Sequence, residues 1–248
     1  MVPDVLVLCY HALSPTWDAA LSTTPARFER HIELLHARGY RGATFTDAVL
    51  GRVGGRVVAV TFDDAYRSVI ERALPILDAL SMPATVFAPT NFIGAEAPLS
   101  WAGVDRWLGG EHVRELTPMS WEELASLADG GWEIGSHTCS HPRLTKLDDR
   151  ALADELERSK ADCERGTQTK CTSLAYPYGD VDRRVVAACV RAGYCAAAAL
   201  PERSLGPSSP MEWPRIGIYQ LDDGLRYRMK VSPAVRRVRS LVHARRVR

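Results

Sequence analysis

The sequence lacks several features that would place it in a familiar class at once. Its six cysteines form no C-x-x-C pair and no disulfide-framework spacing, so we expect reduced thiols. No apolar run approaches the roughly 18–20 residues that a membrane-spanning helix needs. The amino-terminal stretch has Asp4 where a signal peptide carries Lys or Arg, and its apolar run of about six residues is short. These absences predict a cytoplasmic protein.

A strong net charge is also lacking. The 248 residues include 31 Lys and Arg against 30 Asp and Glu, a formal net charge of +1, which gives no indication of nucleic-acid binding. Residues 226–248 nevertheless hold nine Lys or Arg and no acid, so residues 1–225 carry 22 bases against 30 acids, a charge of −8. We expect a folded body over 1–225 and a basic helical tail over 226–248.

The expected tail has an apolar side. The apolar residues that fall near helical spacing are Val235, Val238, Leu241 and Val242. A basic amphipathic helix of this kind suits peripheral contact with an anionic membrane surface. It suits packing on the acidic body of the same protein equally well.

Short apolar runs alternate with helix-like segments along the chain. The expected strands are 5–10, 43–45, 57–62, 84–88, 132–136, 172–176, 194–199 and 215–219, and the expected helices are 25–38, 66–80, 120–130, 148–165 and 181–192. Most of the runs are apolar throughout, as in parallel strands covered on both faces, so the pattern predicts an α/β sheet, open or closed into a barrel. With no internal repeat and no low-complexity linker, we expect one domain. The irregular segments 89–119 and 200–214 are predicted loops, the first a candidate rim of a substrate cleft.

Polar side chains follow four of the expected strands. In chain order they are His11, the pair Asp63 and Asp64, the pair His137 and His141, and Tyr178. Parallel α/β folds build their active sites at the carboxyl ends of strands, so these groups are expected to meet.

The stretch SHTCSH places two imidazoles four residues apart. If the chain turns helically after the strand, both face one side and bind one metal, with a carboxylate from another strand completing the set. One residue of the Asp63–Asp64 pair would ligate and the other would act as general base. The structural alternative is that these aspartates cap a helix beginning near Tyr66, although one aspartate suffices for a cap.

Three motifs of the chain resemble those of the polysaccharide deacetylase (NodB-homology) superfamily. TFDDAYRS is similar to the family's TFDDG motif, with Ala65 in place of the usual Gly, SHTCSHPRL to its H-[ST]-x-x-H motif, and LAYPYGD to its third motif. The resemblance implies a distorted (β/α) barrel and the metal-dependent removal of acetyl from an N-acetylated sugar. Zn²⁺ is the expected metal, with Co²⁺ or Ni²⁺ as alternatives.

The resemblance also implies roles for individual residues. Asp63 would be the general base, and Asp64 would ligate the metal together with His137 and His141. The backbone N–H of Tyr178 would help to stabilise the oxyanion of the reaction.

The chain departs from the family pattern at two places. Ala175 replaces the Arg that orients the general base, and Arg215 of WPRIGIY is our candidate replacement, with a surface salt bridge as the alternative. The family's late His, the general acid, is missing near Tyr219, and His11 is the candidate replacement because some relatives use an N-terminal Tyr-His in that role. The alternative for His11 is a structural hydrogen bond at a strand end. The histidines expected at the surface are His31, His36, His112 and His243.

The expected function is therefore zinc-dependent removal of an N-acetyl group from an N-acetylhexosamine that is small, nucleotide-linked, lipid-linked or part of an oligosaccharide. The alternatives are a non-catalytic glycan-binding module, or a hydrolase of another amide such as a formamide or cyclic imide. Candidate sugar-stacking residues are Trp101, Trp107, Trp121, Trp132 and Trp213, with core packing favoured for Trp121 and Trp132.

Overall fold

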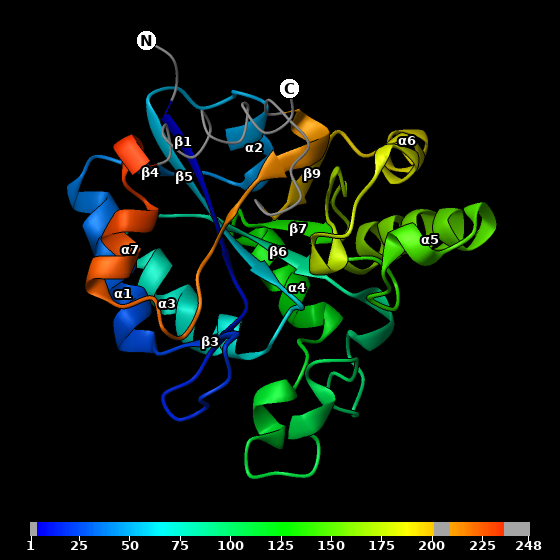
Figure 1. Ribbon diagram of the computed structural model, residues 1–248, viewed down its shortest axis with the longest axis horizontal. Helices are drawn as coiled ribbons and strands as arrows, with labels where there is room; N and C mark the ends of the chain where they lie inside the picture. Colours follow the sequence, from blue (N-terminus) through cyan, green and yellow to red (C-terminus); the bar gives the residue numbers. More distant parts are fainter. Residues whose placement is uncertain (1–3, 201–208, 236–248) are drawn as a thin grey trace.

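The computed structural model describes residues 4–200 and 209–235 (Figure 1). Its strands are β1 Asp4–Tyr10, β2 Ala12–Leu13, β3 Ser22–Thr23, β4 Arg41–Gly42, β5 Arg56–Asp63, β6 Ala84–Ala88, β7 Glu133–Ser136, β8 Ser173–Ala175, β9 Ala196–Ala199, β10 Trp213–Pro214 and β11 Ile216–Gly217. Its α-helices are α1 Pro25–Ala37, α2 Phe45–Val49, α3 Leu74–Asp78, α4 Trp121–Asp129, α5 Asp149–Thr167, α6 Arg183–Arg191 and α7 Gly224–Lys230. A π-helical turn, Val69–Ala73, leads into α3.

Nine of the strands form a parallel sheet that closes almost completely into a barrel surrounded by helices (Figure 1), with β4 paired to β5 beside the main order, while β2 and β3 form a separate two-stranded sheet. The order is β10-β9-β8-β7-β6-β5-β1-β11, so the two ends of the order are neighbours in sequence. We call residues 213–217 the closing strand. Its first half pairs with β9 (Trp213 with Ala198) and its second half with β1 (Ile216 with Leu8). The expectation of a single-domain distorted (β/α) barrel is confirmed.

Alternation along β1 separates the barrel interior from the surface that the helices cover. Leu6, Leu8 and Tyr10 belong to the core cluster that packs against α1 and α3. Val7 belongs instead to an inner cluster with Ala175 and Ala198 on other strands. Because side chains of a strand alternate between its faces, the residues that follow at Cys9 and His11 lie on the inner side with Val7.

Two local expectations about secondary structure had different outcomes. The predicted strand 43–45 is wrong, because the Thr44 side chain accepts a hydrogen bond from the Asp47 amide and α2 begins at Phe45. Thr44, which favours strands by its β-branched side chain, here serves as the N-cap of a helix. The capping box predicted at Ser120 is present, with reciprocal bonds to Glu123.

The final described helix packs onto the barrel. Tyr227 of α7 is buried and stacks on His31 of α1, with ring centroids 3.7 Å apart. The expectation that His31 lies at the surface is therefore wrong, because a partner distant in sequence covers it. The predicted boundary between 225 and 226 falls inside α7. Most of the tail, residues 236–248, lies outside the described residues, and its amphipathic helix stays a prediction.

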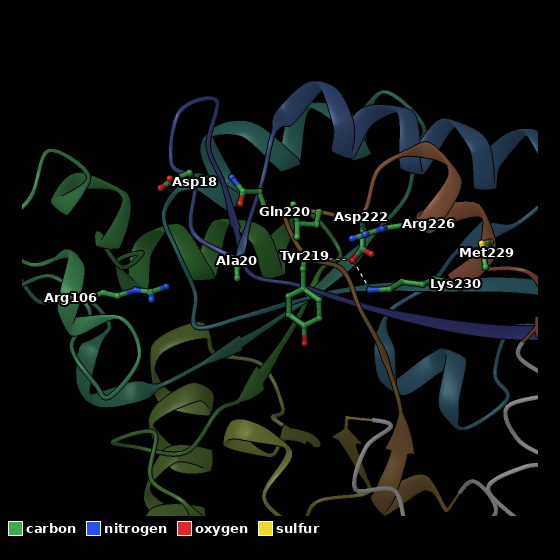
Figure 2. A pocket seen from close by; sticks show the side chains of 10 residues that line it. Asp18, Ala20, Arg106, Tyr219, Gln220, Asp222, Arg226, Met229 and Lys230 are labelled. Atoms are coloured by element: carbon green, nitrogen blue, oxygen red, sulfur yellow. Dashed lines mark hydrogen bonds and ion pairs between the residues drawn. The ribbon is translucent and has the colours of Figure 1, made fainter.

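A groove opens beside the mouth of the barrel (Figure 2). It has a volume of about 690 Å³ and is bounded by Asp18 and Ala20 after β2, Arg106 from the 89–119 segment, and side chains of 219–230. We call it the rim groove. Within the described part of the chain, no helix combines the length and apolarity needed to cross a membrane.

Candidate active site

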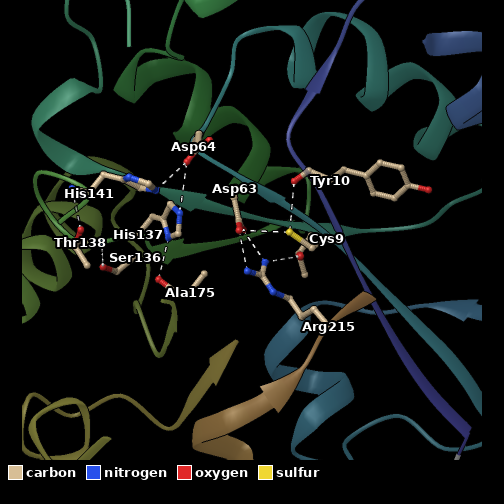
Figure 3. Close-up of polar contacts among 11 residues, drawn as sticks. Cys9, Tyr10, Asp63, Asp64, Ser136, His137, Thr138, His141, Ala175 and Arg215 are labelled. Atoms are coloured by element: carbon tan, nitrogen blue, oxygen red, sulfur yellow. Dashed lines mark hydrogen bonds and ion pairs between the residues drawn. The ribbon is translucent and has the colours of Figure 1, made fainter. Parts of the chain in front are cut away.

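The polar residues expected at strand ends come together at one end of the barrel (Figure 3). Asp63 is the last residue of β5, and Asp64 follows it. His137 comes directly after β7, and Arg215 lies between β10 and β11 in the closing strand. The sequence thus predicts this meeting point from strand ends alone.

Asp64, His137 and His141, which we call the metal triad, are all buried. Asp64 Oδ1 lies 3.4 Å from His137 Nε2 and 3.5 Å from His141 Nε2, and it has no hydrogen-bond partner. Ligands about 2.0–2.2 Å from a tetrahedral zinc ion stand roughly 3.4 Å from one another. These spacings are long for hydrogen bonds and fit donors around one cation. The triad therefore suits a divalent metal.

Left-handed backbone brings the triad together. Asp64 and Ala65 have φ of 70° and 53°, and Thr138 and His141 have φ of 68° and 58°. The idea that a helical turn joins the two histidines is wrong, because 137–141 forms no helix. Such φ values are unfavourable for Ala and for β-branched Thr. Hydrogen bonds hold the 137–141 loop in place: the Cys139 and Ser140 amides donate to Glu155, and the His141 amide donates to Thr138 Oγ1. The φ values also explain why Gly is the usual residue at position 65 of the motif.

Hydrogen bonding sets the tautomer of His137. Its Nδ1 lies 2.8 Å from the carbonyl oxygen of Ala175, so Nδ1–H donates and the Nε2 lone pair faces Asp64. Burial, and next the nearby His137, lower the pKa of His141 to about 3, so its imidazole is neutral. Burial opposes charge on His137 too, but Asp63 and Asp64 outweigh it and raise the pKa of His137. Without metal, the triad therefore tends to hold a proton on His137.

Asp63 is paired on its other side with Arg215. Arg215 Nη1 lies 2.6 Å from Asp63 Oδ1 and Nη2 lies 2.7 Å from Oδ2, in a bidentate geometry. Arg215 is 0% exposed, so the alternative of a surface salt bridge does not hold. Burial raises the pKa of Asp63, but the guanidinium outweighs it and holds the pKa well below its usual range. The carboxylate is thus ionised and fixed in orientation.

Cys9 is a neighbour of Asp63 that sequence reasoning missed. Its Sγ lies 3.4 Å from Asp63 Oδ2, and burial raises the pKa of the thiol well above its usual range, so the S–H donates. Cys9 lies in β1, two residues before His11, which follows the strand. Because side chains two residues apart share one face of a strand, strand alternation was the signal that would have identified Cys9. We call Cys9, Asp63 and Arg215 the base cluster.

His11 lies beside the base cluster, and Tyr178 lies beside His141 of the metal triad. Ligand atoms of His11, Cys9 and Asp63 lie within 4.8 Å of one another, and His11 Nδ1 is buried with no partner among the described residues. Tyr178 has φ of 58°, and its ring centroid is 4.6 Å from that of His141. Their roles as general acid and oxyanion donor stay predictions.

The tryptophans predicted as sugar platforms divide between core and rim. Trp101 stacks on His141, with centroids 4.4 Å apart, which places an aromatic face beside the metal triad. Trp107 packs edge-on against Trp17. Trp132 is 5% exposed and belongs to the core, as favoured from the sequence.

Comparison with known proteins now decides the family. A sequence model described as polysaccharide deacetylase matches residues 51–197. The chain belongs to the polysaccharide deacetylase family. The protein YxkH of Bacillus subtilis is 28% identical over 193 residues, 76% of this chain and 61% of that protein. The poly-beta-1,6-N-acetyl-D-glucosamine N-deacetylase of Staphylococcus aureus strain N315 is 25% identical over 201 residues, 76% of this chain and 64% of that protein. The chain thus aligns with about three fifths of the length of these curated relatives.

Solved structures share the fold of this chain. The Streptococcus pyogenes deacetylase PplD, in complex with acetate, matches with a TM-score of 0.75 and 20% identity, covering 92% of this chain and 98% of that one. IcaB from Ammonifex degensii matches with a TM-score of 0.70 and 21% identity, covering 93% and 99%. At these identities the likeness establishes the barrel alone.

Proposed function

We propose that this chain is a metal-dependent N-deacetylase that removes the acetyl group from an N-acetylhexosamine unit of a glycan. The observation that carries the proposal is the arrangement of two adjacent aspartates with opposite surroundings. Asp64 faces two imidazoles without hydrogen bonds, whereas Asp63 is held by Arg215. The named activity of the Staphylococcus aureus relative supports the choice of N-acetylhexosamine.

Asp64, His137 and His141 would hold the metal, for which Zn²⁺ fits the donor set best. Bound Zn²⁺, Co²⁺ or Ni²⁺ polarises a carbonyl and lowers the pKa of its water from 15.7 towards about 7. The hydrogen bond from His137 Nδ1 to the Ala175 carbonyl keeps the imidazole oriented for ligation.

The chain's own groups handle the protons. Asp63 accepts a proton from the water that attacks the acetamide carbon, and Arg215 keeps both carboxylate oxygens oriented. Its lowered pKa makes Asp63 a weak base that is always ionised, so its contribution is position and charge rather than strong basicity. His11 donates a proton to the nitrogen as the C–N bond breaks, which yields acetate and a free amine. The Tyr178 N–H donates to the oxyanion.

Acetate release tests this proposal. Zinc-loaded protein is assayed against a panel that runs from free N-acetylglucosamine through nucleotide- and lipid-linked forms to β-1,6- and β-1,4-linked oligosaccharides. Release from at least one member is expected. Its absence from every member would contradict the proposal and favour a hydrolase of another amide or a non-catalytic glycan-binding module.

A further inference from the structure

The rim groove joins two opposed arginines (Figure 2). Arg106 reaches in from the 89–119 segment and Arg226 from α7, on the other side of the groove. No described carboxylate lies within ion-pair distance of either guanidinium. Lys230, the third cation, is already paired, 2.6 Å from Asp222 Oδ2, with its ammonium also donating to the Gly217 carbonyl.

The balance of charge in the groove favours an anion. Its cations are Arg106, Arg226 and Lys230, and its acids are Asp18 and Asp222. Because Lys230 and Asp222 neutralise each other, two arginines face one exposed aspartate. A guanidinium presents a planar fork of donors that matches phosphate oxygens, so a phosphate or diphosphate group is the anion that this pair suits.

The groove also has an apolar exit. Leu221, Leu225 and Met229 are 71%, 72% and 54% exposed and recur at every fourth residue along the approach to α7 and its outer side. Leu221 and Met229 line the groove itself. Large exposed apolar side chains gathered beside cations are typical of a surface that contacts lipid chains.

Tyr219 connects the groove to the base cluster. Arg215 and Gly217 lie two residues apart in the closing strand and so share one face, and Tyr219 follows the strand by two residues. A Cβ added at Gly217 would lie 2.7 Å from the Tyr219 hydroxyl oxygen, so the tyrosine ring lies directly over the glycine on the side of Arg215. Tyr219 therefore lines the rim groove and covers the same face of the closing strand that carries Arg215.

We propose that the rim groove binds the diphosphate and the first isoprene units of a polyprenyl-diphosphate-linked N-acetylhexosamine. This rests on the proposed function and names its substrate class. The diphosphate lies between Arg106 and Arg226, the prenyl chain leaves over Leu221 and Met229, and the sugar enters the barrel mouth past Tyr219. A neutral polysaccharide would contact neither the two arginines through a phosphate nor the apolar exit through a lipid chain. A nucleotide-linked sugar would contact the two arginines but not the apolar exit.

The test measures binding of probes that contain no acetamide and are not turned over. Full-length, zinc-loaded protein is titrated calorimetrically with farnesyl diphosphate and with uridine diphosphate. The double variant Arg106→Ala/Arg226→Ala is expected to bind farnesyl diphosphate at least about tenfold more weakly, since two charge-assisted hydrogen-bonding groups are lost. Leu221→Gln/Met229→Gln is expected to weaken farnesyl diphosphate binding severalfold and leave uridine diphosphate unchanged.

Matched controls lie elsewhere on the surface. Arg150→Ala on α5 removes an exposed arginine, and Val190→Gln on α6 removes an apolar side chain that is 55% exposed. Both are expected to bind farnesyl diphosphate like the wild type. Wild-type affinity in the arginine double variant would overturn the proposal. The lipid assignment would be overturned if uridine diphosphate binds as tightly as farnesyl diphosphate and if Leu221→Gln/Met229→Gln leaves farnesyl diphosphate binding unchanged.

These outcomes are separable from failure of the proposed function. Groove binding with no acetate release from any substrate would contradict the deacetylase and leave the groove assignment standing. Acetate release from a substrate, together with farnesyl diphosphate binding that the two arginine changes do not weaken, would support the deacetylase and overturn the groove assignment.

Discussion

The metal triad and the base cluster hold adjacent aspartates in opposite ways. Asp64 Oδ1 has two imidazole nitrogens at 3.4 and 3.5 Å and no hydrogen bond, whereas the oxygens of Asp63 lie 2.6 and 2.7 Å from the guanidinium nitrogens of Arg215. Asp64 stands on left-handed backbone with φ of 70°, while Asp63 ends a regular strand. Asp64 Oδ1 therefore has no hydrogen-bond donor among the described residues, whereas both oxygens of Asp63 accept hydrogen bonds from Arg215.

The different surroundings of Asp64 and Asp63 suit the two carboxylates to different roles. A site whose donors face one another without hydrogen bonds gains free energy when a cation enters, because the repulsion and desolvation of its donors are relieved. A carboxylate already neutralised by a buried guanidinium gains nothing from a cation and keeps its orientation. These surroundings support the proposal that Asp64 ligates a metal and Asp63 accepts a proton.

The largest expected effect is that of emptying the metal triad. Chelation of the metal, or His137→Ala, is expected to lower acetate release by about 10³-fold or more, since a catalytic metal supplies several kcal/mol. Added Zn²⁺ should restore the chelated wild type but not the variant. The control is His36→Ala, an exposed histidine of α1. Undiminished release after chelation, with metal content verified as nil, would contradict the account.

Breaking the base cluster is expected to act on stability as well as on activity. Arg215→Ala leaves the buried Asp63 unpaired, which should lower the free energy of unfolding by about 3–5 kcal/mol. The matched control is Arg158→Ala, whose 2.9 Å pair with Asp154 on α5 is more than half exposed on both sides and should matter little. Urea unfolding of the wild type and the two variants measures the two changes in the free energy of unfolding. Equal stability of the two variants would show that Asp63 does not depend on Arg215.

Metal affinity is expected to depend on pH through the triad. The raised pKa of His137 in the metal-free protein means that protonated His137 contributes stability at low pH, which is lost as the pH rises through that pKa. Metal must displace this proton, so zinc affinity should fall by up to about tenfold per pH unit below the pKa of His137. Zinc competition with a chelator of known affinity measures this across the pH range. A flat profile would argue against His137 as a ligand.

The smallest expected effect concerns Cys9. Its thiol adds one weak hydrogen bond to a carboxylate that Arg215 already holds, so Cys9→Ala should lower acetate release by no more than about tenfold. Cys9→Ser retains a donor and should stay closer to the wild type. Steady-state kinetics of both variants provide the measurement. A loss as large as that of Arg215→Ala would make Cys9 an equal partner in the base cluster.

Much of the fold and the meeting point of the site could be predicted from the sequence. Wholly apolar runs indicate buried parallel strands, and polar residues placed just after them must converge at one end of the barrel. This reasoning reaches Asp63, Asp64 and His137 without any knowledge of tertiary contacts. Arg215 came instead from the resemblance to the family, as the candidate replacement for the Arg that Ala175 displaces.

The remaining details depend on contacts that no local pattern encodes. Thr138 and His141 have left-handed backbone, and hydrogen bonds to Glu155, distant in sequence, hold the loop that contains them, so a helical turn is the wrong geometry for this pair of histidines. His31 is buried because Tyr227, almost two hundred positions later in the sequence, stacks on it. Cys9 lacked any motif of its own, and only strand alternation would have placed its thiol beside Asp63.

The central claim is that two neighbouring aspartates divide metal binding and proton transfer between them. The most direct measurement compares Asp63→Asn and Asp64→Asn, which preserve shape, for bound zinc by elemental analysis and for acetate release. The account predicts that Asp64→Asn loses both zinc and activity, whereas Asp63→Asn retains zinc and loses activity by about 10²–10⁴-fold. Loss of zinc from Asp63→Asn, or full activity in either variant, would contradict it.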